Sequence, residues 1–233
     1  MKNTKSILLL VLCAVSTTVT YAQKTFSITT GSKNYSAKIQ VPNCDDNTCS
    51  GKGTITLYQN NNSKVFQTLI SPEIFIYLDQ KSGKPTANLT NKTGEENPLV
   101  FDDFNFDGSE DIAVRNGNKS GYGGPSYDVY VFNRTKKQFV LSKELTRLAS
   151  NNLGMFETNS KTKRLSTFTK SGCCWHQYFE YEVVPNKGLV LVSKRTEDAT
   201  KNQDNVIVTK ELLVNGKWKK TTKTYKTDDY FKQ

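Results

Sequence analysis

The residues best suited to chemistry lie in one short acidic stretch, Phe101 to Val114. Counted from its second aspartate, oxygen-bearing side chains occupy positions 1, 3, 5 and 9, and a glycine occupies position 6. These positions are Asp103, Asn105, Asp107, Asp111 and Gly108. Calcium takes about six to eight oxygen ligands, which alternate residues of a tightly curled loop supply. The pattern DxNxDGxxD therefore predicts a calcium-binding loop, with the peptide oxygen of Ser109 as a further ligand.

The flanks of this stretch argue against a helical EF-hand. Position 12 is Val114, where that motif has a bidentate glutamate. The short apolar runs Leu99 to Phe101 and Ile112 to Val114 prefer strands, so we expect a calcium loop between two strands. The alternative is a solvated acidic turn. A bound ion would be structural, because three carboxylates would otherwise repel across one loop, and we expect it to fix the neighbouring glycine-rich segment.

No group of residues in the sequence predicts catalysis. His176 is the only histidine, so a catalytic triad or a two-histidine metal centre would have to be built around it alone. We interpret it as a paired histidine at the start of a strand. In the alternative interpretation, Trp175 and His176 line a binding face. Glu180 and Glu182 lie on the same face of a predicted strand, where we expect both carboxylates to be solvated. They are not the opposed acid pair that a glycosidase needs, so we expect that the protein is not an enzyme.

The first residues predict a signal peptide, residues 1–22. Lys2 and Lys5 form a basic start, Ile7 to Val15 an apolar core too short to span a bilayer, and Thr20 to Ala22 a cleavage site. Cys13 follows Leu12 rather than a small residue, so we expect it to be removed with the signal. The protein is then exported, either periplasmic or secreted, with no membrane span.

About 211 residues remain, enough for a single domain over residues 23–233. The whole chain carries a formal charge of +10, and loss of Lys2 and Lys5 leaves about +8. An exported protein without a recognition motif is not expected to bind nucleic acid. A lysine cluster near the end predicts the solvated face of a hairpin, and its members are Lys217, Lys219, Lys220, Lys223 and Lys226.

Four cysteines remain after the signal, and an even number in an oxidising compartment suggests two disulfides. They are Cys44, Cys49, Cys173 and Cys174. The first two bracket a polar turn and could form a local bridge. The adjacent pair could bridge to each other, or each could reach one of the first pair. The spacing contains no CxxC, which argues against zinc.

Alternating polar and apolar residues predict an all-β chain of antiparallel hairpins. Early strands are predicted at Tyr35–Val41, Gly53–Tyr58, Val65–Leu69 and Ile74–Tyr77, with Pro72 as a break. Four later hairpins are predicted at Tyr127–Leu141, Gly154–Phe168, Trp175–Val192 and Val206–Tyr225, the last turning at Asn215-Gly216. A short helix is predicted over Ser142 to Ser150.

The stretch from Val100 to Phe132 resembles a known family. The acidic loop is followed by the glycine-rich segment Gly117 to Gly124 and by Tyr127-Asp128-Val129-Tyr130. This order is similar to that in periplasmic immunity proteins that neutralise lysozyme-like effectors of bacterial type IV secretion systems, which are related to periplasmic inhibitors of invertebrate-type lysozyme. The resemblance implies a β-propeller-like domain, calcium in the acidic loop, and inhibition of a muramidase by blocking its active site.

The related lysozyme inhibitors insert a Ser-Gly-x-Tyr loop into the cleft of the enzyme. The segment Ser120 to Tyr127 is similar, but Tyr122 comes one residue early and Tyr127 several residues late. Ser120, Gly121, Tyr122 and Tyr127 are therefore the expected partner contacts, together with Trp175 and His176. The partner is expected to be a muramidase-type effector or a lysozyme. Two alternatives stay open: the segment is only a long turn between strands, or the chain is a calcium-stabilised propeller-type binding or adhesion module of the cell envelope.

Overall fold

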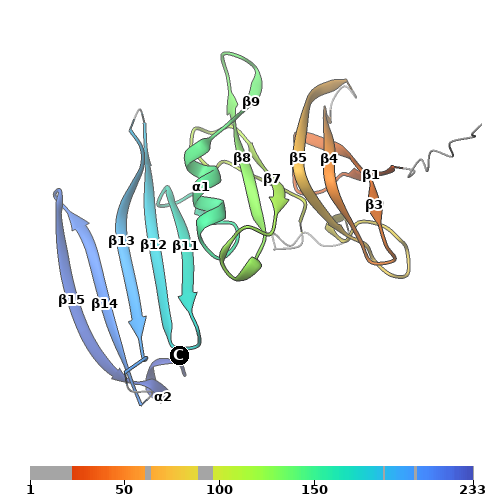
Figure 1. Cartoon of the computed structure of the whole chain (residues 1–233). Helices are drawn as coiled ribbons and strands as arrows, with labels where there is room; N and C mark the ends of the chain where they lie inside the picture. Colours follow the sequence, from red (N-terminus) through yellow and green to blue (C-terminus); the bar gives the residue numbers. More distant parts are fainter. Residues whose placement is uncertain (1–22, 61–63, 89–96, 186, 202–203, 233) are drawn as a thin grey trace, which may run out of the picture.

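The computed structural model describes residues 23–60, 64–88, 97–185, 187–201 and 204–232, so the predicted signal peptide lies outside the described residues. Figure 1 shows three antiparallel sheets that follow one another along the chain. The all-β, antiparallel part of the prediction is confirmed, whereas the described residues form no closed propeller. Among the described residues, no helix is both long and apolar enough to cross a membrane.

The first sheet is formed by the N-terminal strands. It consists of β1 (Lys24–Ile28), β2 (Tyr35–Val41), β3 (Asn43–Cys44), β4 (Thr48–Gln59) and β5 (Val65–Tyr77). Strand β5 continues through Pro72, where a break was predicted, and that prediction is wrong. The pairing of β4 with β5 shifts between Gly51 and Gly53, so Pro72 lies in a bulge where its missing N–H costs no ladder hydrogen bond. A 3-10 turn, η1 (Thr86–Asn88), follows.

The central sheet is a four-stranded meander. It consists of β6 (Leu99–Asp102), β7 (Asp111–Gly117), β8 (Ser126–Asn133) and β9 (Gln138–Leu141), with the turn η2 (Gly121–Gly123) between β7 and β8. The acidic loop joins β6 to β7, as predicted. Every residue of β7 is buried, because the sheet is covered on both faces. Ile112 and Val114 pack into the core shared with the first sheet, and Ala113 packs into the core on the other side.

The second core contains the short helix α1 (Lys143–Asn151), which is confirmed close to its predicted bounds. The Ser142 hydroxyl caps its start by accepting the N–H of Leu145 at 3.3 Å. Leu145, Leu148 and Ala149 are buried on one face of the helix. They pack with Phe156 and other residues that link the central sheet to the last sheet.

The last sheet is a six-stranded meander. It consists of β10 (Glu157–Asn159), β11 (Arg164–Ser171), β12 (Trp175–Val184), β13 (Gly188–Asp198), β14 (Asn205–Val214) and β15 (Lys217–Lys226), and α2 (Thr227–Tyr230) follows it. The predicted strand from Gly154 is wrong in its start, because β10 begins at Glu157. Asn215 and Gly216 both have positive φ, of 52° and 74°, as a two-residue hairpin turn requires.

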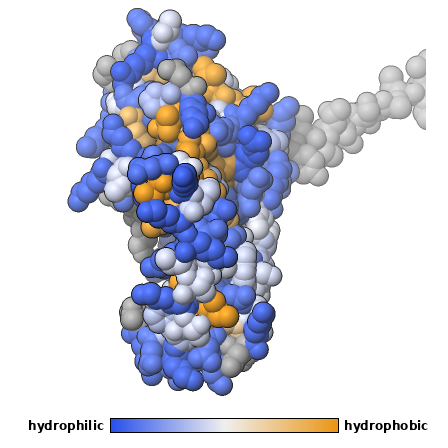
Figure 2. Space-filling model, turned by 90° about the vertical axis from the view of Figure 1, so that its left-hand side faces the viewer, coloured by the Kyte–Doolittle hydropathy of each residue, from blue (hydrophilic) through white to orange (hydrophobic). Residues whose placement is uncertain are grey.

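Strand β15 is exposed along its whole length, so the lysines of the cluster are solvated, as predicted, but they alternate between the two faces of the strand and do not share one face. Figure 2 views the molecule from the side of this strand. That surface is mainly hydrophilic, with apolar patches concentrated in its upper half.

Candidate functional site

The acidic loop is curled by its own side chains. The two carboxylate oxygens of Asp103 accept the N–H groups of Asp107 at 3.0 Å and Gly108 at 2.8 Å. The Asn105 side-chain oxygen also accepts the Asp107 N–H at 3.0 Å, and the Asp107 carboxylate accepts the Ser109 N–H at 2.7 Å. Gly108 has a φ of +84°, which lets the chain reverse after the third oxygen-bearing residue. The loop therefore has the curled form that the spacing predicts.

One cationic side chain lies against this loop. Arg134, in the turn between β8 and β9, donates from Nε to the Ser109 hydroxyl at 2.8 Å and from Nη2 to the Asp107 carbonyl. Its Nη2 also lies 3.6 Å from the Asp107 carboxylate. The guanidinium thus offsets part of the loop's negative charge. Sequence reasoning missed this contact because it spans 27 positions.

Asp111 links the loop to the sheet from a fully buried position. Its carboxylate accepts the backbone N–H of Phe132 at 2.8 Å and that of Phe104 at 3.0 Å. The pKa of Asp111 is raised to about 7, chiefly by burial and to a smaller extent by the nearby charges of Asp107 and Asp103, although the two backbone hydrogen bonds lower it. A cation beside Asp111 would relieve this cost.

The described residues contain no group of three or more His, Cys, Asp or Glu side chains placed to hold a metal ion. The expected ligand set has other members, since it includes the Asn105 side chain and the Ser109 carbonyl. Its atoms are all hard oxygens, which suit calcium, and each carboxylate oxygen that accepts one N–H keeps a second lone pair. In its donor chemistry the loop fits calcium, and calcium binding stays a prediction.

The glycine-rich segment lies at the opposite end of β7. The strand runs from Asp111 to Gly117, about 20 Å at the usual rise per residue. An ion in the acidic loop would therefore not contact the glycine-rich segment. We predicted that the ion fixes the glycine-rich segment. Because the length of β7 separates the two, the ion cannot do so by direct contact.

The glycine-rich segment is anchored instead by the chain that follows α1. Ser120 is buried, and its hydroxyl accepts the Gly154 N–H at 3.2 Å. The Gly121 N–H donates to the Asn152 carbonyl at 2.8 Å. These contacts hold the base of the segment, so Ser120 and Gly121 act as its anchors.

Tyr122 projects from this anchored base. It has a φ of +57° within η2, and 68% of it is exposed. Its hydroxyl accepts the Gly172 N–H at 2.7 Å, and the Lys170 Nζ lies 5.3 Å from the centre of its ring. The ring is thus held at its tip while most of its surface faces solvent.

Tyr127 occupies the opposite environment. Only 1% of it is exposed, and its hydroxyl donates to the Asn97 carbonyl at 3.2 Å. The protein itself covers this side chain. Of the two tyrosines considered for a partner's cleft, Tyr122 is the one on the surface.

Trp175 and His176 are successive residues of β12, so they point to opposite faces of the last sheet. His176 pairs in register with Lys170, which lies against the ring of Tyr122, so His176 is on the side of Tyr122. Its Nδ1 lies 3.5 Å from the buried Glu197 carboxylate. The two side chains therefore do not share one binding face.

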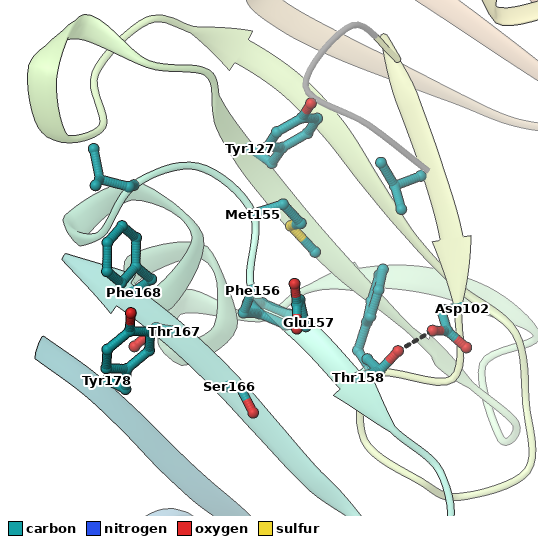
Figure 3. A pocket seen from close by; sticks show the side chains of 13 residues that line it. Asp102, Tyr127, Met155, Phe156, Glu157, Thr158, Ser166, Thr167, Phe168 and Tyr178 are labelled. Atoms are coloured by element: carbon teal, nitrogen blue, oxygen red, sulfur yellow. Dashed lines mark hydrogen bonds between the residues drawn. The ribbon is translucent and has the colours of Figure 1, made fainter. Parts of the chain in front are cut away.

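A cavity of about 820 Å³ separates the central sheet from the last sheet (Figure 3). It is lined by Val100, Asp102, Phe104, Tyr127, Leu153, Met155, Phe156, Glu157, Thr158, Ser166, Thr167, Phe168 and Tyr178. The sequence carried no signal for it, because its walls come from five separate strands, the acidic loop and the segment after α1.

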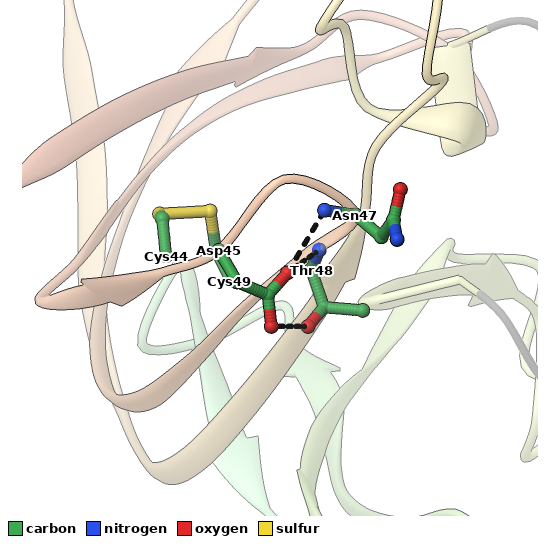
Figure 4. The surroundings of a disulfide bond; sticks show 5 residues. All are labelled: Cys44, Asp45, Asn47, Thr48 and Cys49. Atoms are coloured by element: carbon green, nitrogen blue, oxygen red, sulfur yellow. Dashed lines mark hydrogen bonds between the residues drawn. A yellow bond between two sulfur atoms is a disulfide. The ribbon is translucent and has the colours of Figure 1, made fainter.

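Both disulfides are local. Cys44 bonds to Cys49 across a turn in which the Asp45 carboxylate accepts the N–H groups of Asn47 and Thr48 (Figure 4). Cys173 bonds to its neighbour Cys174. This vicinal bridge directly follows Gly172, the residue that contacts the Tyr122 hydroxyl. The connectivity left open by the sequence is thereby resolved.

The carboxylates examined for catalysis are paired with a cation. Arg164 lies 3.2 Å from Glu180 and 3.1 Å from Glu182, with one amino group directed at each. Two carboxylates held by one guanidinium on a single strand do not form the opposed acid pair that glycoside hydrolysis uses.

No protein-family model matches this chain, and no curated protein matches it. Among solved structures, it is similar to a Xanthomonas protein described as type IV secretion system related. The TM-score is 0.64 and the sequence identity 23%, over 84% of this chain and 93% of the other. At this identity the likeness shows a shared fold.

Proposed function

We propose that this chain is an exported immunity-type protein that inhibits a lysozyme-like cell-wall hydrolase by occupying its cleft. Two lines of support are independent of each other. One is the resemblance of residues 100–132 to immunity proteins against lysozyme-like secreted effectors. The other is the fold shared with a Xanthomonas protein described as type IV secretion system related. The role requires export to the periplasm or beyond the cell.

The observation that carries the proposal is the geometry of Tyr122. An aromatic ring buries a large area when it enters a cleft, and its hydroxyl can pair with a polar group there. Because Ser120, Gly121 and Gly172 already hold the segment, little conformational freedom would be lost on binding. The glycines on either side of Tyr122 allow close approach of a partner's backbone.

We propose that the chain works by binding and has no catalytic residues. Its one histidine is paired with Glu197, and its adjacent strand carboxylates are paired with Arg164. Inhibition would then require only that the partner's substrate be excluded from the cleft. Turnover would stop at a ratio close to one inhibitor per enzyme.

We further propose a structural calcium ion in the acidic loop. Asp103, Asn105, Asp107 and Asp111 would hold it through side chains, and Ser109 through its carbonyl. The ion would supply positive charge beside the buried Asp111 carboxylate. The loop's own side chains curl the backbone, and Arg134 restrains its outer edge.

The test is a titration of purified muramidases, including one encoded beside this chain's gene, with the wild-type protein. We expect near-stoichiometric loss of cell-wall hydrolysis. Tyr122→Ala should weaken inhibition about 30-fold, as expected for a central aromatic anchor. The matched control is Tyr225→Ala, which removes an exposed tyrosine of β15 far from η2 in the chain.

Failure of the wild-type protein to inhibit any of these enzymes would refute the proposal. Equal inhibition by the wild type and by Tyr122→Ala would remove Tyr122 from the contact. Calcium-dependent attachment to cell surfaces without enzyme inhibition would instead support the propeller-type binding or adhesion module.

A further inference from the structure

The groove between the central and last sheets differs in charge and polarity from one end to the other. Figure 3 shows Asp102 and Thr158 at one end and the rings of Phe168 and Tyr178 at the other. Met155 and Phe156 lie between these ends. A ligand in this groove would therefore meet an acidic end, an apolar middle and an aromatic end.

The acidic end has two exposed carboxylates, Asp102 and Glu157. Asp102 accepts hydrogen bonds from the Thr158 hydroxyl and from the Asp103 N–H, which fix its orientation. Within the described ranges neither carboxylate forms a salt bridge. In a protein whose sequence carries 32 basic and 22 acidic residues, this is a local reversal of charge.

The aromatic end carries no free charge. The rings of Phe168 and Tyr178 lie 4.9 Å apart, and the Arg195 guanidinium lies 4.0 Å from the Tyr178 ring. Arg195 is also paired with Glu197 at 3.4 Å, so a cationic group finds no unpaired carboxylate at this end and is attracted instead to Asp102 and Glu157. Glu157 pairs in register with Ser166, which precedes Phe168 by two residues, so the two ends are about 7 Å apart along β11.

An extended lysine or arginine side chain matches this arrangement, because it carries a cation on an apolar stem. The net positive charge of the protein repels free cations at long range. A cation therefore reaches this groove most readily when other contacts have already docked the molecule that carries it. A side chain of a partner protein is therefore favoured over a small free amine.

We propose that the groove receives a lysine or arginine side chain of the partner protein, with its cation at Asp102 and Glu157 and its stem against Met155. The inference rests on the proposed function, since the occupant belongs to the inhibited partner. Tyr122 and the groove would then be two separate contacts of one interface.

The test uses amide NMR on the full chain with capped Ala-Lys-Ala and Ala-Arg-Ala peptides at millimolar concentration. We expect saturable shifts at Glu157, Thr158 and Ser166. Glu157→Gln should weaken the binding about fivefold, as for loss of one exposed charge pair. The matched control is Glu211→Gln, on β14 of the same sheet, which should leave the binding unchanged.

Three outcomes would overturn the inference. In the first, neither basic peptide shifts these amides. In the second, the neutral peptide Ala-norleucine-Ala binds equally well, which would make the groove merely apolar. In the third, free spermidine binds as tightly as the peptides, which would make a polyamine the ligand. Because no hydrolase is present, this result is independent of the inhibition assay.

Discussion

The two loops at the ends of β7 are held in different ways. The acidic loop closes on itself, since Asp103, Asn105 and Asp107 bond to backbone N–H groups two to five residues away. The glycine-rich segment has a few local backbone hydrogen bonds, but it is tied to the rest of the fold by residues 34 and 50 positions further along the chain. One loop is therefore specified locally, and the other depends on the tertiary structure.

This difference separates a stabilising role from a presenting role. A loop that folds on its own side chains can shape an ion site with little help from the rest of the fold. A segment with glycines has little conformational preference of its own, so other elements must fix it before Tyr122 can be presented. Variants at the two loops should accordingly change different properties.

The largest effect is expected at Asp111, where the acidic loop meets the sheet. Asp111→Ala leaves the buried N–H of Phe104 and the partly buried N–H of Phe132 without their acceptor. We expect the free energy of unfolding to fall by about 4 kcal/mol, at one to three for each lost partner. Urea denaturation measures it, with the exposed Asp46→Ala as control. A loss equal to the control's would show that Asp111 does not join the loop to β8.

The next effect is that of calcium on the acidic loop. Calcium at about 100 times its Kd should stabilise the fold by about 2.7 kcal/mol, or about 5–10 °C in Tm for a chain of this size. A chelator should reverse the shift, and Asp107→Ala should abolish it. Thermal denaturation with and without chelator gives the result. Identical Tm values would contradict a bound ion.

Arg134→Ala sharpens the same test. The guanidinium shares Asp107 and Ser109 with the proposed ion, so its removal should preserve or increase the calcium-dependent shift. If Arg134→Ala instead lowers the Tm equally with and without calcium, while the wild type shows no shift, the arginine alone neutralises the loop.

The sequence predicted features that depend on neighbouring residues. The Asn215-Gly216 hairpin, the curl of the acidic loop and helix α1 all follow from local turn, spacing and capping chemistry. Pro72 was misread because a bulge in β5 depends on the partner strand. Strand β1 was missed, since its five residues contain only two apolar side chains, Phe26 and Ile28, and its pairing with β2 fixes it.

The candidate site divides in the same way. Spacing identified the acidic loop, and resemblance identified the segment with Tyr122. Neither could assign Tyr127 to the interior, because that depends on how β8 packs against the rest of the fold. The contact of Tyr122 with Gly172 and the groove between the sheets bring together distant segments, and no local pattern encodes them.

A smaller effect is expected where the glycine-rich segment packs most tightly. A Cβ at Gly124 would lie 2.8 Å from the Ser120 hydroxyl, which accepts the Gly154 N–H. Gly124→Ala should cost about 2 kcal/mol and expose the Gly154 amide to exchange. Gly123→Ala, where a Cβ meets nothing within 4 Å, should cost about 1 kcal/mol for its left-handed φ and leave that amide protected. Equal exchange in both variants would contradict this anchoring.

The smallest effect on stability is expected at the Tyr122 hydroxyl. The variant tests whether the hydrogen bond of this hydroxyl positions the exposed ring. Tyr122→Phe removes the hydroxyl that accepts the Gly172 N–H but keeps the ring. Stability should fall by only about 0.5 kcal/mol, because water can replace an exposed partner. Hydrogen exchange at Gly172 should accelerate, while Tyr225→Phe, at another exposed tyrosine, should leave it unchanged. Unchanged exchange at Gly172 would mean that Lys170 and the loop's own anchors position the ring. The glycine-rich segment would then be fixed mainly at its base and not at the tip of Tyr122.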